Sequence, residues 1–123
     1  MELDIKQDAV AIKSFDWDLL LQQTGRKEAI AKEILALFMQ DLPNLQEQIN
    51  SAFQNKQFKN LAEILHKLNG ACSYCGMPKL KKLAQELELA IKENNSFSYE
   101  KYIHDIDQEC NNLKIMIKKT SLI

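Results

Sequence analysis

The sequence predicts an all-α fold, an antiparallel up-and-down four-helix bundle with a short extra helix at its N-terminus. Four long segments place apolar residues three and four positions apart, which is the period of one helix face. No stretch alternates apolar and polar residues for long, so no strand pattern competes with the helices. The connections between the segments are short and polar, which favours antiparallel packing of neighbouring helices.

Length and composition fit a single soluble domain. The chain has 123 residues, of which 46% are hydrophobic and 27% charged, and its formal net charge is −1. This near-neutral balance gives no indication of a nucleic-acid or membrane surface. No apolar run approaches the ~20 residues of a membrane span. Three cysteines without a secretory segment indicate a reducing cytoplasm.

The N-terminal part divides into a tail and a first helix. Residues 1–13 are mixed in character and are expected to be a tail or linker, followed by the bundle over residues 14–123. Capping residues in the run Ser14-Phe15-Asp16 precede a short helix from Trp17. Thr24-Gly25 is expected to close this helix.

A long helix is predicted from Arg26 to about Asn55. Its apolar stripe consists of Ile30, Ile34, Leu37, Phe38, Leu45, Ile49 and Ala52. Pro43 interrupts the pattern, which then resumes in nearly the same phase, so one kinked helix is favoured over two. A second apolar group, Leu35, Met39 and Leu42, lies beside the stripe. It either packs under the short first helix or forms a docking patch.

The remaining chain predicts three more helices. They run from about Gln57 to Cys75, from Pro78 to about Glu93, and from about Ser98 to Lys119. Gly76 and Pro78 separate the first two, as a C-terminal cap and a first helical residue. Asn69-Gly70 is an alternative end, but the apolar period continues beyond it. A glycine inside a helix costs roughly 1 kcal/mol relative to alanine, so an interior Gly70 needs a reason.

His66 falls on the side of its helix opposite the apolar stripe. Its neighbours one turn away, Ala62 and Gly70, are small, so another molecule can approach the ring closely. A neutral imidazole nitrogen is a nucleophile near pH 7 and can accept a phosphoryl group. No carboxylate or second histidine is evidently placed to complete a hydrolytic site, which indicates a carrier. The alternative is an ordinary solvated histidine.

These residues carry a resemblance to a known family. The run from Leu65 to Gly70, followed by Ser73 and Gly76, resembles the histidine phosphotransfer (HPt) domain, whose pattern is H-x-L-K-G with a glycine six residues later. The family's leucines on the next helix correspond to Leu80, Leu83 and Leu87-Glu88. The similarity extends over roughly residues 15–119 and is strongest to the C-terminal module of BarA-type hybrid sensor kinases.

The resemblance implies that His66 is a phosphoacceptor. It would take a phosphoryl group from an aspartate of a response-regulator receiver domain and pass it to another receiver. The family lysine three residues after the histidine is Asn69 here, which can donate a hydrogen bond but carries no charge. Residues implied to support the phosphoryl group or the approaching receiver are Lys67, Asn69, Gly70, Ala62 and Ser73.

The resemblance also sets expectations for cofactors and partners. No cofactor of its own is implied, and Mg²⁺ is expected on the partner receiver. The chain has only three glycines and no phosphate-binding loop, so no autonomous kinase or ATPase activity is expected. We expect a monomeric cytoplasmic domain without nucleic-acid or direct membrane contact. It is either free-standing or the cytoplasmic end of a membrane-bound sensor kinase.

Two further groups of residues have open interpretations. Lys79, Lys81 and Lys82 are either solvated or attract the acidic pocket of a receiver, with Lys79 and Lys82 as docking candidates. Cys72 and Cys75 are either core residues or a metal or redox pair, and core is favoured because both fall on or beside the apolar face. We assign no metal ligands. The competing function is a helical interaction or metal-binding module without phosphotransfer.

Overall fold

The computed structural model describes residues 12–123 and is built there from helices alone. In chain order the elements are α2 (Trp17–Gln23), α3 (Glu28–Gln54), α4 (Phe58–Cys75), α5 (Pro78–Lys92), the 3₁₀ helix η1 (Ser96–Ser98) and α6 (Tyr99–Thr120). Residues 1–11 of the expected tail lie outside the described part of the chain.

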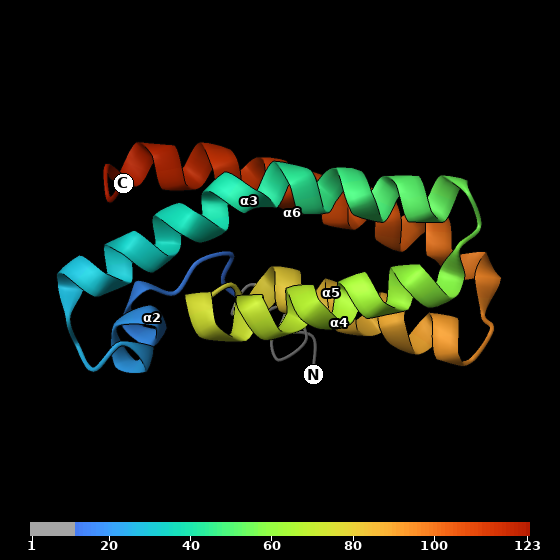
Figure 1. Cartoon of the computed structure of the whole chain (residues 1–123), viewed down its shortest axis with the longest axis horizontal. Helices are drawn as coiled ribbons and strands as arrows, with labels where there is room; N and C mark the ends of the chain where they lie inside the picture. The colour runs from blue at the N-terminus through green and yellow to red at the C-terminus, as the bar shows by residue number, and fades with distance from the viewer. Residues whose placement is uncertain (1–11) are drawn as a thin grey trace, which may run out of the picture.

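The four long helices form two layers, with α3 and α6 in one and α4 and α5 in the other (Figure 1). Each long helix packs against the next in the chain, and α6 closes the ring against α3. The short α2 packs against α3 and α4 at one end of the bundle. The predicted fold class, a helical bundle with a short extra helix, is confirmed.

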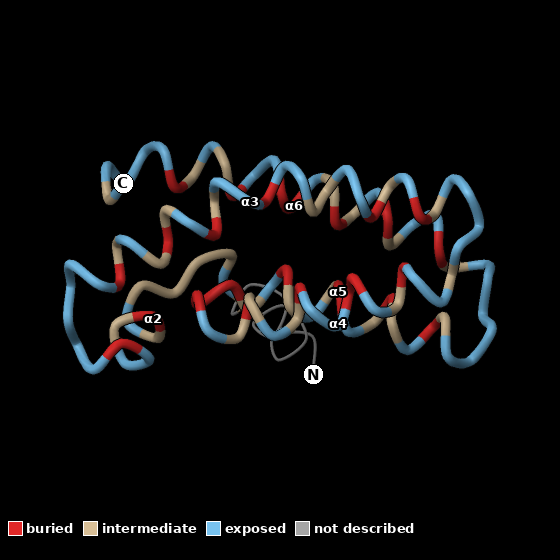
Figure 2. The backbone as a smooth tube through the Cα atoms, in the orientation of Figure 1, coloured by how far each residue is buried: buried red, intermediate tan, exposed pale blue. Residues whose placement is uncertain are grey.

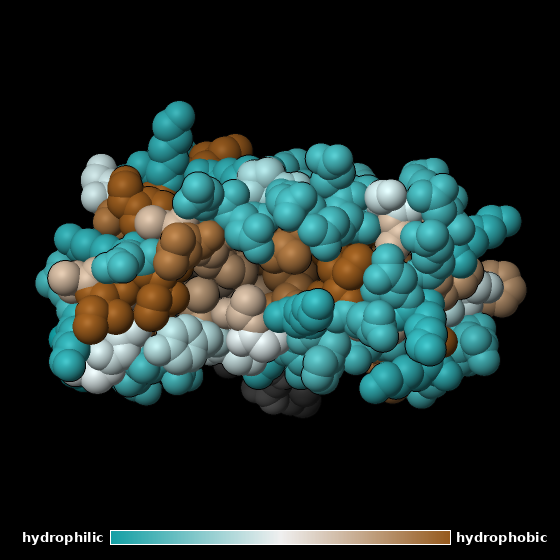
Figure 3. Space-filling view, in the orientation of Figure 1, coloured by the Kyte–Doolittle hydropathy of each residue, from teal (hydrophilic) through white to brown (hydrophobic). Residues whose placement is uncertain are grey.

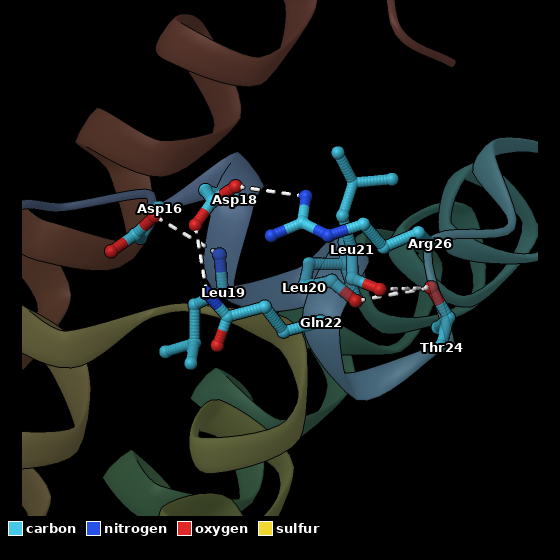
Figure 4. A network of polar contacts seen from close by, with 8 residues as sticks. All are labelled: Asp16, Asp18, Leu19, Leu20, Leu21, Gln22, Thr24 and Arg26. Carbon is cyan, nitrogen blue, oxygen red and sulfur yellow. Dashed lines mark hydrogen bonds and ion pairs between the residues drawn. The ribbon is translucent and has the colours of Figure 1, made fainter.

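Polar contacts hold the short α2 in shape (Figure 4). The Asp16 carboxylate caps the helix by accepting a hydrogen bond from the Leu19 N–H at 3.1 Å. At the other end the Thr24 hydroxyl donates to the Leu20 carbonyl at 3.1 Å. Asp18 forms an ion pair with Arg26 at 3.1 Å. The Asp16 and Thr24 contacts satisfy backbone groups that a helix of seven residues leaves unpaired at its ends.

The turn between α4 and α5 also anchors the start of α2. Gly76 has φ +74° and caps α4, and Pro78 begins α5, both as predicted. The Gly76 carbonyl accepts a hydrogen bond from the Asp16 N–H at 2.7 Å. The helix passes through Gly70 without a break, so the alternative end at Asn69-Gly70 is wrong.

α3 is a single helix with Pro43 inside it, and Figure 1 shows it bending near its middle. Proline removes one backbone hydrogen bond, which accounts for the bend. One helix rather than two is therefore the correct prediction.

The predicted apolar stripe is wrong in part in the first half of α3. Phe38 is buried as predicted and Ile34 is partly buried, but Ile30 and Leu37 are exposed, and Ala31, Leu35 and Leu42 are buried in their place. Both sets have a helical period, so periodicity alone does not select between them. The choice depends on where the neighbouring helices α2, α4 and α6 pack against α3.

The burial of Leu35 and Leu42 also corrects their proposed docking role. Both side chains are fully buried, so they cannot form an exposed patch, and Met39 is half-buried against the core. The three residues belong to the bundle core or pack against it, and no contact with α2 is needed to explain their burial.

The core fills the space between the two layers, because buried positions of every long helix face inward (Figure 2). Its largest fully buried side chains are Leu20, Leu35, Leu42, Ile49, Leu61, Leu65, Leu68, Met77, Leu80, Leu87, Ile106 and Leu113. Within residues 12–123, no helix combines the length and apolar character that crossing a bilayer requires.

Candidate functional site

The His66 side chain projects from the middle of α4 into solvent. It is 76% exposed, while Leu65 and Leu68 beside it in sequence are buried in the core. A Cβ added at Gly70 would meet no atom within 4 Å. The ring therefore stands beside open space on the C-terminal side, as the sequence predicted.

A carboxylate that sequence analysis did not place at the site lies next to this ring. Glu88 Oε2 of α5 is 3.3 Å from His66 Nδ1, and the Glu88 side chain is only 13% exposed. Glu88 was part of the family resemblance, but it was given no role. The signal was present in the sequence: His66 lies eleven residues before Met77 and Glu88 eleven after it. Antiparallel helices joined by a two-residue turn bring such positions side by side.

Glu88 gives the two ring nitrogens different environments. A carboxylate at Nδ1 favours the tautomer in which Nδ1 carries the proton. The lone pair then resides on Nε2, the other ring nitrogen. An exposed Nε2 in this state can attack an electrophile delivered by another molecule.

Lysines complete the surroundings of the imidazole. Lys92 Nζ of α5 lies 3.7 Å from the Glu88 Oε2 atom that also contacts His66. His66 itself lies in an open groove of about 600 Å³ between α4 and α5. The groove is lined by Lys59, Ala62, Glu63, His66, Lys67, Glu88 and Lys92.

Several predicted site residues lie outside this groove. The Asn69 Oδ1 atom is buried and has no hydrogen-bond partner among the described residues. The Ser73 hydroxyl donates to the Asn69 carbonyl at 3.0 Å. Lys79 pairs with Glu109 of α6 at 3.8 Å, and Lys82 lines a separate pocket beside residues 12–16. The structure thus gathers Ala62, His66 and Lys67 of the predicted set, with Gly70 adjacent.

The three cysteines are core residues. Cys72, Cys75 and Cys110 are buried and free. Burial raises the pKa of the Cys75 thiol to about 11 and that of Cys110 to about 12, and it raises the pKa of Cys72 further. Such thiols are poor nucleophiles and poor metal ligands. Within residues 12–123, no group of three His, Cys, Asp or Glu side chains could hold a metal ion.

Apolar surface gathers at the end of the molecule where α2 and the first half of α3 lie (Figure 3). Leu37 is 61% exposed, and Ile30 and Tyr74 are each 43% exposed. The Tyr74 hydroxyl donates to the Gln23 carbonyl at 3.4 Å, which places the last turn of α4 against α2. We call Ile30, Leu37 and Tyr74 the end patch.

Comparison with known proteins agrees with this geometry. Residues 33–115 match the Hpt domain family. The chain is 29% identical over 79 residues to the signal transduction histidine-protein kinase BarA of Escherichia coli K12, and 32% identical over 88 residues to the sensor protein GacS of Pseudomonas syringae. These alignments cover 64% and 72% of this chain but only 9% and 10% of the relatives, so the chain spans about a tenth of their length.

A solved structure has the same fold. The crystal structure of the HPT domain from a sensor hybrid histidine kinase of Shewanella superposes with a TM-score of 0.78 at 30% identity. The superposition covers 87% of this chain and 92% of the other.

Proposed function

This chain belongs to the Hpt domain family, and on that premise we propose that His66 is the phosphoacceptor of a histidine phosphotransfer carrier in phosphorelay signalling. The observation that carries the proposal is the exposed imidazole of His66, with Glu88 at Nδ1 and Nε2 free. The open space at Gly70 supports it further, because a protein donor must come close to the ring.

The chemistry is an exchange of one phosphorus bond for another. The bond from phosphorus to an aspartate oxygen of the donor breaks as the bond from phosphorus to Nε2 forms, and the aspartate leaves as a carboxylate. The imidazole gains positive charge in this step, and the Glu88 carboxylate at Nδ1 stabilises that charge. Passing the group to a second aspartate reverses these changes.

The partners that fit this chemistry are response-regulator receiver domains. A receiver provides the aspartate and the Mg²⁺ that neutralises the transferring group, so this chain contributes the histidine and its groove. The end patch offers an apolar surface for docking. We propose a cytoplasmic domain, monomeric in isolation, that works alone or as one module of a hybrid kinase.

Transfer from a charged receiver tests the proposal. A receiver domain phosphorylated with labelled acetyl phosphate and Mg²⁺ is mixed with the wild-type chain, His66→Gln and His104→Gln. His104 is the only other histidine and lies exposed on α6, which makes it the matched control. We expect acid-labile, base-stable label on the wild type and on His104→Gln, and none on His66→Gln.

Label retained by His66→Gln would rule out His66 as the acceptor. A wild-type chain that binds receivers but never takes label favours the competing function, an interaction module without phosphotransfer.

A further inference from the structure

Phosphorylation of His66 would add negative charge to a groove that already contains carboxylates. The phosphoryl group carries a charge of about −2 at neutral pH. Two carboxylates, Glu63 and Glu88, already line the groove, and Glu88 contacts the imidazole itself. Like charges this close repel one another, so the phosphorylated state needs a nearby cation.

Position 69 cannot supply that cation. Asn69 is uncharged, and it stands where the family pattern has a lysine. Its Oδ1 atom is buried and its side chain does not line the groove around His66. Within this chain, the nearest cations are the three lysines that do line the groove.

Lys92 is the best placed of the three. Its ammonium group and the His66 imidazole contact the same oxygen of Glu88, at 3.7 and 3.3 Å. Lys67 lies about 100° around α4 from His66 and also lines a separate pocket beside α3. Lys59 is seven residues earlier, about two turns along the helix.

We propose that Lys92, from α5, contacts the phosphoryl oxygens on His66 and takes the place of a lysine three residues after the histidine on α4. This inference rests on the proposed function of His66. Rotation of the flexible lysine side chain from Glu88 toward Nε2 brings its ammonium group to the new charge. Glu88 then remains paired with the positively charged ring.

A small-molecule phosphoryl donor tests the contact between Lys92 and the phosphoryl group without any effect of protein docking. Phosphoramidate transfers its phosphoryl group to histidine with loss of ammonia, and the rate of labelling of His66 is followed at low and high salt. The variants are Lys92→Gln, Lys92→Arg, and Lys92→Gln combined with Asn69→Lys. Lys119→Gln, an exposed lysine in the last turn of α6, controls for the change in net charge.

We expect Lys92→Gln to slow labelling by up to about fivefold at low salt, the upper end of the factor for one exposed ion pair. Lys92→Arg and Lys119→Gln should label at the wild-type rate. Asn69→Lys should restore the rate in the Lys92→Gln background, because it returns a cation to the phosphoryl group from α4. A purely structural role for Lys92 would not be rescued in this way.

The outcomes separate this inference from the proposed function. A wild-type chain labelled on His66, with Lys92→Gln equally fast, overturns the inference and leaves the function intact. A Lys92→Arg variant as slow as Lys92→Gln also overturns it, because the cation retained at position 92 would then make no difference. No label on His66 in the wild type overturns both.

Discussion

His66 meets two requirements that usually conflict at one residue. A phosphoryl carrier must expose its nucleophile to a visiting protein, yet a freely rotating exposed side chain presents no fixed atom. Here the ring is 76% exposed, while the neighbouring Glu88 is largely buried and holds a fixed position at Nδ1. The exposed ring is thus oriented by a largely buried carboxylate, which on the proposed function keeps Nε2 available to a phosphoryl donor.

The open space beside Gly70 predicts opposite effects of two substitutions. Gly70→Ala should raise the free energy of unfolding by about 1 kcal/mol, because alanine favours the helix and its Cβ meets no neighbour. Gly70→Leu should stay folded but slow transfer from a receiver by about a hundredfold, since helical side chains lean toward the preceding turn and His66. Urea unfolding and the receiver assay measure the two effects.

Two results would contradict this explanation of the glycine. One is a Gly70→Leu variant that accepts phosphate at the normal rate. The other is a Gly70→Ala variant that is less stable than the wild type.

The exposure of His66 and Gly70 and the burial of the cysteines could be predicted from the sequence. The angle of each residue around its helix is enough to decide which of them face water. The sequence did not place Asn69 and Ser73, which do not line the groove around His66. Their angles bring them near the His66 side of α4, but α5 covers part of that side and the Asn69 Oδ1 atom is buried. Which flank of a helix a neighbour covers is a tertiary property.

The α4–α5 turn is the element on which the site depends. Gly76 adopts a left-handed conformation there, and its carbonyl accepts a hydrogen bond from the Asp16 N–H at 2.7 Å. A Cβ at this position would be driven into the Asp16 carbonyl oxygen. The turn therefore requires glycine both for its dihedral angle and for the close approach of the segment that begins α2.

Gly76→Ala should consequently destabilise the protein by about 2–3 kcal/mol, the sum of the left-handed penalty and the clash. Gly25→Ala is the matched control, because Gly25 has φ +66° but no atom within 4 Å of its Cβ position. That variant should lose only about 1 kcal/mol. Urea denaturation of both compares them directly, and equal losses would show that the contact with Asp16 contributes nothing.

At the scale of elements, the predicted boundaries of α4 and α5 agree with the structure because Gly76 and Pro78 are strong local signals. The buried face of α3 was mispredicted in its first half for a different reason. Its apolar residues surround most of the helix there, and the stripe through Ile30 and Leu37 has the same period as the buried one through Leu35 and Leu42. The positions of the helices that pack against α3, namely α2, α4 and α6, distinguish them.

At the scale of the whole molecule, the exposed members of the mispredicted stripe, Ile30 and Leu37, belong with Tyr74 of α4 to the end patch. We proposed this patch as the surface that docks a receiver. Leu37→Glu should therefore weaken receiver docking, raising the apparent KM for the charged receiver about tenfold while the unfolding free energy changes by less than about 0.5 kcal/mol. Steady-state transfer kinetics and urea denaturation measure the two quantities.

The matched control is Ile115→Glu, which replaces an exposed isoleucine of α6 with the same acid. It should leave the KM unchanged. Similar effects of the two variants would mean that the end patch is not the docking surface.

The equal distances of His66 and Glu88 from Met77 have an evolutionary consequence. In the α4–α5 hairpin, the number of residues between His66 and Glu88 determines that these two side chains lie opposite each other. A single inserted residue within either arm would turn the more distant partner by about 100° and carry it off the shared edge. Descendants of this protein can vary most side chains along the hairpin, but they cannot readily change its length.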